Sequence, residues 1–286
     1  MSSHTCAVLL ALLLLAQPAA AQPARPSGPP RPRAAAGWDQ ARLAEIDGII
    51  ATGIADGRMP GAVVVVGRGD TVVFEKAYGQ RATAPLAEPM TLDTVFDMAS
   101  LTKVVATTTA VMQLVERGVV RLTDPVAQWV PGFEKYGKRG ITVRHLLTHV
   151  SGLRPDVDLG EPWKGYDAAI ELAKEEVPQS APGERFVYSD INFFLLGHIV
   201  AQASGLSLER YVAERVFGPL GMTDTGFLPP IERVGRIAPT ERCRFLDAWP
   251  CKAPDVEPLR GVVHDPTARR MGGVAATPGS SARRAT

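Results

Sequence analysis

Ser100 and Lys103 are the two residues whose types and spacing best suit chemistry. They lie three positions apart at the start of an apolar run, in which valines such as Val104 and Val111 recur at helical intervals until Gly118. Residues i and i+3 share one face of a helix, so the lysine amine comes within reach of the serine hydroxyl. The helix N-terminus adds backbone N–H groups and a positive dipole end. The pattern therefore suits a serine nucleophile with a base beside it.

The same four-letter S-x-x-K pattern also arises by chance, as a capping serine followed by a solvated lysine. A lysine serves as a general base only where its surroundings lower its pKa from ~10.4 towards ~7–8. A helix dipole, worth ~0.3–1 kcal/mol, cannot achieve this alone. The pair must therefore be judged by what the rest of the chain supplies.

The composition favours a globular protein that acts on small or neutral substrates. The chain has 286 residues, of which 45% are hydrophobic, with 31 basic and 30 acidic residues and no long block of one sign. This charge pattern lacks the electrostatic footprint of a nucleic-acid or anionic-membrane partner. We expect no nucleic acid as a partner, and the sequence makes no prediction of oligomeric state.

The N-terminal region has the pattern of an export signal. Residues 7–16 are rich in Leu and Ala, and the small residues Ala19, Ala20 and Ala21 follow. We predict a signal peptide over 1–21, a disordered Pro/Ala/Arg-rich linker over 22–37, and a periplasmic or secreted protein with no transmembrane segment. The alternative is an uncleaved apolar start, because residues 1–5 contain no Lys or Arg.

Neither the cysteines nor the histidines predict a metal site. Cys243 and Cys251 would remain after cleavage, and their spacing leaves a disulfide and two free thiols equally open. His145 and His149 stand at i and i+4, but Leu146 occupies the position where the zinc motif H-E-x-x-H needs Glu. We expect no metal and no cofactor.

The folded part is predicted to begin near Trp38 with mixed α and β structure. Residues 39–55 carry apolar residues at helical spacing, with Asp39 as a possible N-cap. Residues 62–67 and 71–79 are β-branched runs joined by a turn, which predicts a β-hairpin. The continuous apolar character of its first strand predicts burial on both faces, beneath helices.

Several segments, in order, resemble the superfamily of serine β-lactamases, penicillin-binding proteins and related esterases, whose S-x-x-K element matches Ser100 and Lys103. Class C β-lactamases, D-Ala-D-Ala carboxypeptidases and family VIII-type esterases are the similar groups. The likeness runs from about Leu43 to about Ala275. It is carried by residues 96–107, the tripeptide 59–61 (Met-Pro-Gly), residues 121–126 (Arg-Leu-Thr-Asp-Pro-Val), residues 141–153 (Ile-Thr-Val-Arg-His-Leu-Leu-Thr-His-Val-Ser-Gly-Leu) and residues 216–225.

The resemblance implies an α+β fold of the β-lactamase/transpeptidase type, with an antiparallel sheet flanked by helices and a mostly helical region. It implies one serine hydrolase domain over 38–275. Within the family's Y-x-N motif, Tyr188 matches and Asp190 stands where Asn is usual. Ser100 would then be the nucleophile, Lys103 and Tyr188 would move the proton, and Asp190 would position Lys103. The alternative for Tyr188 is an aromatic residue that packs at the start of the helix 191–204.

The resemblance also assigns His149 to a hydrogen-bonding turn. The family's third motif, K-T-G or H-x-G, has no match after Ser100, and residues 276–286 carry no hydrophobic periodicity. We therefore expect a chain truncated at its C-terminus, without the last strands, that ends in a disordered tail over 276–286. That motif supplies one oxyanion-hole donor, whose loss typically costs ~10²–10³ in rate.

Two functions remain open. The first is a serine hydrolase that forms an acyl-enzyme on an ester or amide, with a small-molecule or peptidoglycan-type substrate such as a β-lactam, a D-Ala peptide or a small ester. The second is a catalytically inactive remnant or binding protein of the same superfamily.

Overall fold

The computed structural model describes residues 38–240, 258–274 and 280–282. The predicted signal peptide, the predicted linker and both Cys243 and Cys251 lie outside the described residues. Everything below concerns the described part of the chain.

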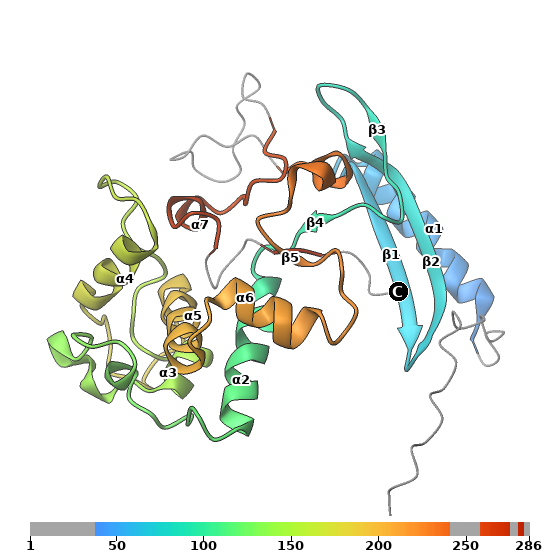
Figure 1. The fold of residues 1–286 in the computed structure, drawn as a ribbon. Helices are drawn as coiled ribbons and strands as arrows, with labels where there is room; N and C mark the ends of the chain where they lie inside the picture. The colour runs from blue at the N-terminus through green and yellow to red at the C-terminus, as the bar shows by residue number, and fades with distance from the viewer. Residues whose placement is uncertain (1–37, 241–257, 275–279, 283–286) are drawn as a thin grey trace, which may run out of the picture. The chain divides into compact units, whose positions relative to one another are not determined.

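A helix and a hairpin open the fold, as the sequence predicts. Asp39 caps the first helix by accepting hydrogen bonds from the backbone N–H groups of Ala41 and Arg42, at 3.0 and 3.2 Å. The helix lies along the antiparallel hairpin, whose second strand also pairs with a short third strand (Figure 1). These elements are α1 (Gln40–Ala55), β1 (Gly61–Arg68), β2 (Thr71–Ala82) and β3 (Glu88–Pro89).

The prediction that the first strand is buried on both faces is wrong. Most of β1 is half-buried, and the Val65 side chain is 42% exposed. Among the described residues, β1 has β2 as its one neighbour, so it lies at an edge of its sheet. A run of valines satisfies the β propensity of an edge strand as well as that of a central one, because the pattern alone does not specify what covers the strand.

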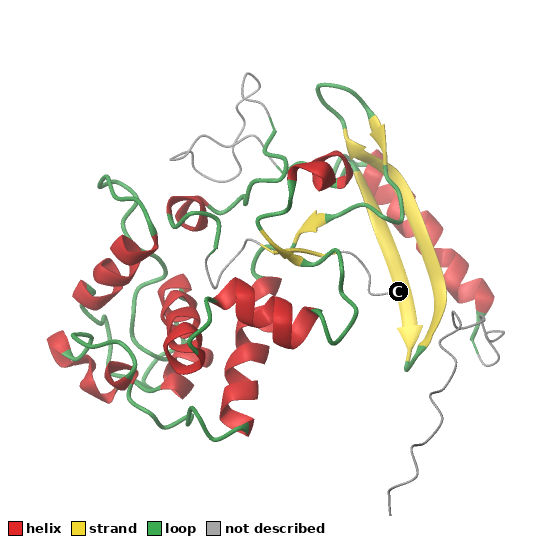
Figure 2. Cartoon of the chain, viewed as in Figure 1, coloured by secondary structure: helices red, strands yellow, loops and turns green. Residues whose placement is uncertain are grey.

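The second region is mostly helical and holds the main hydrophobic core (Figure 2). At its centre, α5 buries every side chain from Ile191 to Leu196. Its elements are η1 (Lys103–Thr108), α2 (Thr109–Glu116), η2 (Val126–Gln128), η3 (Lys135–Gly140), α3 (Val143–Leu147), α4 (Tyr166–Glu175), α5 (Asp190–Ser204), α6 (Leu208–Val212), η4 (Ala213–Phe217) and α7 (Pro266–Arg270). The short helix η5 (Ile231–Arg236) contributes no residue to that core.

No single described helix is long and apolar enough to cross a membrane. One bent pair, Asp190–Ser204 with Leu208–Phe217, meets the length and composition criteria together across a 72° bend. The core residues of that pair are buried by protein in this structure.

A second small sheet includes three residues of the predicted disordered tail 276–286, whose other residues lie outside the described part of the chain. The structure describes Ser280–Ala282 as strand β6, which pairs antiparallel with both β4 (Phe96–Asp97) and β5 (Gly226–Phe227). Backbone hydrogen bonds build such a strand whatever the side chains are, so a run of small residues gives no hydrophobic period to detect.

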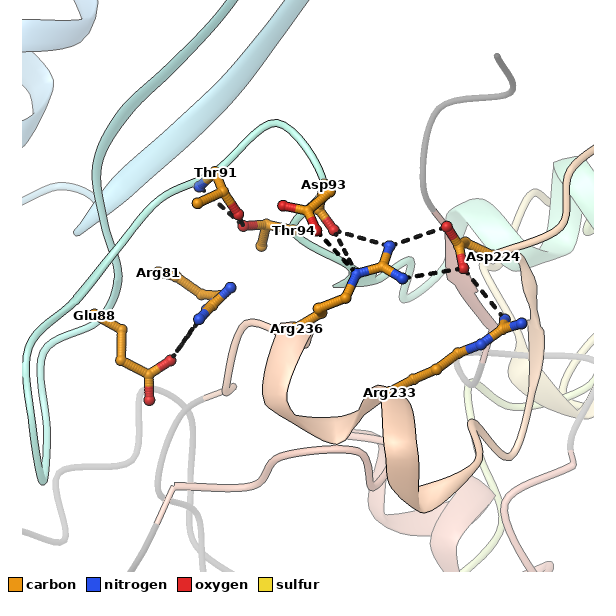
Figure 3. Close-up of polar contacts among 8 residues, drawn as sticks. All are labelled: Arg81, Glu88, Thr91, Asp93, Thr94, Asp224, Arg233 and Arg236. Carbon is orange, nitrogen blue, oxygen red and sulfur yellow. Dashed lines mark hydrogen bonds and ion pairs between the residues drawn. The ribbon is translucent and has the colours of Figure 1, made fainter.

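Arg236 fixes the chain that leads to the S-x-x-K pair (Figure 3). Its guanidinium contacts the Asp93 carboxylate at 3.1 Å and the Asp224 carboxylate at 2.9 Å. It also donates to the Asp93 carbonyl at 3.1 Å, while its own carbonyl accepts from the Val95 N–H at 2.9 Å. A planar guanidinium has five donors in a fixed geometry, so it can bind the segments that carry Asp93 and Asp224 at the same time. These contacts fix the backbone just before β4, the strand that leads to Ser100.

Candidate active site

A tight turn presents Ser100 at the start of its helix. Ala99 has a positive φ of 45°, which is rare for a residue with a Cβ. The Asp97 carboxylate holds this turn by accepting from the Ala99 N–H and, with its other oxygen, from the His264 N–H, both at 2.9 Å. The sequence analysis missed Asp97, although an Asp two residues before a turn is a known signal of such a side-chain-to-backbone bond.

The helix after Ser100 opens with π-helical geometry. The π segment η1 runs from Lys103 to Thr108 and continues into α2. Short π segments occur frequently at functional sites. Lys103 is the first residue of this segment and is only 3% exposed. Its ammonium therefore meets protein groups and little water.

The structure brings together all four residues predicted from the sequence. Lys103 Nζ lies 3.2 Å from Ser100 Oγ and 2.5 Å from Asp190 Oδ1. The same nitrogen lies 5.0 Å from the centre of the Tyr188 ring. A cation over an aromatic ring is attracted by the negative charge of the π face of that ring. Asp190 thus takes the position beside Lys103 that the resemblance implied for it.

Asp190, Tyr188 and Ser100 differ in how they are held and in how far solvent reaches them. Asp190 is the first residue of α5, and its backbone N–H donates to the Pro155 carbonyl at 2.7 Å. Tyr188 lies two residues earlier and is 44% exposed, so one side of its ring meets the protein and the other remains accessible. Ser100 is also exposed. The Ser100 side chain and the Tyr188 phenol can therefore be reached from solvent, while the Lys103 ammonium cannot.

Two further carboxyl groups near Asp190 were not found from the sequence. Burial raises the pKa of Asp156 to about 7, and the negative charges of Asp190 and Asp265 add to the effect. Burial likewise raises the pKa of Asp265 to about 6. The carboxylate of Asp156 accepts from Thr267 Oγ1 and from the Val157 N–H, both at 2.8 Å. No sequence pattern marks Asp156, because Thr267 and the charges around it come from distant segments. Asp265 precedes Pro266 and caps α7, a local pattern that indicates a helix start and not a buried carboxyl group.

The raised pKa of Asp156 predicts a pH-dependent stability. Its ordinary pKa is 3.8, so between about pH 4 and pH 7 the folded state holds the proton more tightly than the unfolded state. The stability from this group is complete below that window and is lost as the pH rises through about 7. We expect Asp156→Asn to raise the free energy of unfolding at about pH 8 by roughly 2–4 kcal/mol. Urea melts of both proteins from about pH 4 to pH 8 measure this.

Asp158→Asn is the matched control, because Asp158 is an exposed aspartate two residues away in the same loop. Its free energy of unfolding should follow the wild-type pH dependence. Equal pH dependence of Asp156→Asn and the wild type would mean that Asp156 is ionised at no cost in the folded state.

The two histidines at i and i+4 serve different elements. His145 Nδ1 accepts from the Thr142 N–H at 3.2 Å and completes the N-terminal cap of α3. His149 Nδ1 accepts from the Ser189 N–H at 3.0 Å. Among the described residues, no three His, Cys, Asp or Glu side chains gather as metal ligands would. The hydrogen-bonding turn predicted at His149 is thus present, and its partner is the segment that carries Tyr188.

The family model described as Beta-lactamase matches residues 46–285, which is most of the chain. The chain belongs to the beta-lactamase family. A "Putative D-alanyl-D-alanine carboxypeptidase" of Salmonella heidelberg (strain SL476) is 30% identical over 267 residues, a match that covers 83% of this chain and 60% of that relative. The chain thus spans about 60% of the length of the curated relatives that it matches.

Two solved structures share the fold of this chain. "EstCE1, a hydrolase with promiscuous acyltransferase activity" aligns with a TM-score of 0.69 at 24% identity, covering 85% of this chain and 70% of that chain. A class C beta lactamase aligns with a TM-score of 0.69 at 24% identity, covering 87% of this chain and 64% of that chain. The resemblance inferred from the motifs and the predicted β-lactamase/transpeptidase-like fold class are both confirmed.

Proposed function

We propose that this protein is a serine hydrolase that forms an acyl-enzyme on an ester or amide. The observation that supports this most strongly is the position of Lys103 Nζ, 3.2 Å from an exposed serine hydroxyl and in an ion pair with Asp190. A nucleophile beside a nitrogen base that is itself oriented by a third group is the arrangement that covalent catalysis needs.

In this proposal Lys103 first gives up the proton of its ammonium form. Ser100 Oγ then attacks the carbonyl carbon and passes its own proton to the neutral amine, directly or through the Tyr188 hydroxyl. The carbon–heteroatom bond then breaks, and the leaving group departs with the proton from the same pair. Water attacks the resulting acyl-enzyme and returns the serine hydroxyl. Asp190 fixes the lysine nitrogen next to the hydroxyl throughout. The substrate class lies among β-lactams, D-Ala peptides and small esters, and the apolar and small-residue pattern of residues 1–21 supports action outside the cytoplasm.

Peptide mapping after covalent labelling tests the proposal. The chain is incubated with a fluorophosphonate probe, digested with trypsin and analysed by mass spectrometry. We expect the probe on the peptide 82–103, in which Ser100 is the only serine. Hydrolysis of nitrocefin and of p-nitrophenyl acetate then separates the substrate classes. A cooperatively melting protein with no label on that peptide would instead support the binding-protein alternative.

A further inference from the structure

His149 fastens both neighbours of Tyr188 at once. Its carbonyl oxygen accepts from the Val187 N–H at 2.9 Å, and its ring Nδ1 accepts from the Ser189 N–H at 3.0 Å. The residue is 9% exposed and adopts a positive φ of 55°. Because φ > 0 is uncommon for residues other than Gly, even though His adopts it more readily than most, the hydrogen bonds to Val187 and Ser189 help to hold this conformation. One residue on the turn after α3 thus fixes the backbone on either side of Tyr188.

The His149 ring also supports the phenol ring directly. The two rings stack with centroids 4.5 Å apart and planes 24° from parallel. On the α5 side, the Phe193 ring lies 5.2 Å from the imidazole. The Tyr188 ring therefore lies against His149 while the Lys103 ammonium faces it at 5.0 Å. A shift of the imidazole would move the phenol relative to Lys103.

The hydrogen bonds determine the form of the imidazole. The Ser189 N–H can only donate, so Nδ1 carries the lone pair and the neutral ring carries its proton on Nε2. Burial and the positive charge of Lys103 lower the pKa of His149 below its ordinary 6.5, whereas the charge of Asp190 opposes them. A proton on Nδ1 would turn the acceptor into a donor and abolish the bond to Ser189.

We propose that His149 is a positioning residue for Tyr188, which holds the phenol against Lys103 only while the imidazole is neutral. This inference rests on the proposed role of Tyr188 in proton transfer. It predicts that acid releases Tyr188 and slows the acylation of Ser100.

Two variants separate the ring from the acceptor. His149→Asn keeps an oxygen near the position of Nδ1 and tolerates a positive φ, but loses the stacked ring. His149→Phe keeps a ring and loses the acceptor. We expect each to lower the fluorophosphonate labelling rate by about 10- to 100-fold, because a misplaced proton-transfer group costs this much. The half-saturating probe concentration should change less than the labelling rate, since both variants act on Ser100 only through Tyr188.

The pH profile supplies the readout that a purely structural role would not move. The wild-type labelling rate should fall on acidification below pH 6.5, in part because His149 becomes protonated. His149→Asn has no imidazole to protonate, so its labelling rate should lack that part of the fall. A rate equal to wild type in both folded variants, or the same acid limb in His149→Asn, would overturn the proposal.

Nitrogen NMR of the wild-type chain distinguishes failure of this inference from failure of the proposed function. An unprotonated Nδ1 near neutral pH, with an exchange-protected Ser189 amide, is expected whether or not Ser100 reacts. A protonated Nδ1 would overturn the positioning role even in an active enzyme. If the wild type takes no label, the hydrolase function fails, and with it the positioning role in catalysis, whatever the NMR shows.

Discussion

Replacement of Ser100 by alanine is expected to abolish covalent labelling and hydrolysis. The methyl group has no lone pair with which to attack a carbonyl or phosphorus atom, and losing the nucleophile of such an enzyme typically costs on the order of 10⁶ in rate. Ser100 is exposed, and its backbone carbonyl accepts from the Lys103 N–H at 3.1 Å in a way that alanine preserves. The melting temperature should therefore remain that of the wild type.

Ser207→Ala provides the matched control for this substitution. Ser207 is also an exposed serine just before a helix, and its hydroxyl donates to the Glu209 carboxylate at 2.6 Å. This variant should label at the wild-type rate. Persistent labelling of Ser100→Ala on the peptide 82–103 would show that another residue of that peptide reacts, and the assignment of the nucleophile would be lost.

The sequence could predict the elements whose signals are local. The hydrophobic spacing and Asp39 predict α1, and the two β-branched runs predict the hairpin, because caps, turns and periods involve neighbouring residues. Ser100 and Lys103 belong to the same category, since one helix brings them together. Their meeting with Tyr188 and Asp190 was predicted from the family resemblance, because the spacing of these residues does not specify a contact between separate elements.

What the sequence could not predict depends on contacts between distant segments. Asp156 gains its environment from Thr267 and Asp265, more than a hundred residues away along the chain. The strand β6 forms by backbone pairing with β4 and β5, and no periodic pattern of apolar side chains predicts that pairing. The prediction that β1 is buried on both faces is wrong for the same reason. Its valines favour a β-strand, but they do not determine which elements cover that strand.

The ion pair of Lys103 predicts two separable effects when the lysine is replaced. Lys103→Met should lower the labelling rate by about 10²–10⁴-fold, the typical contribution of a positioned acid or base. It should also destabilise the fold by about 3 kcal/mol, because the Asp190 side chain, only 21% exposed, would keep its charge without a partner. Labelling kinetics and urea melts measure the two effects independently.

The double variant Lys103→Met/Asp190→Asn distinguishes chemistry from folding. Asparagine carries no charge, so the double variant should recover most of the lost stability while its labelling rate stays as low as that of Lys103→Met. Asp190→Asn alone keeps the lysine and places the family's usual residue at 190, so it should label at least a hundredfold faster than the double variant, on the order of the effect expected for Lys103. Should labelling recover together with stability in the double variant, Lys103 would act through the fold alone, and the proton would have to pass through Tyr188 without it.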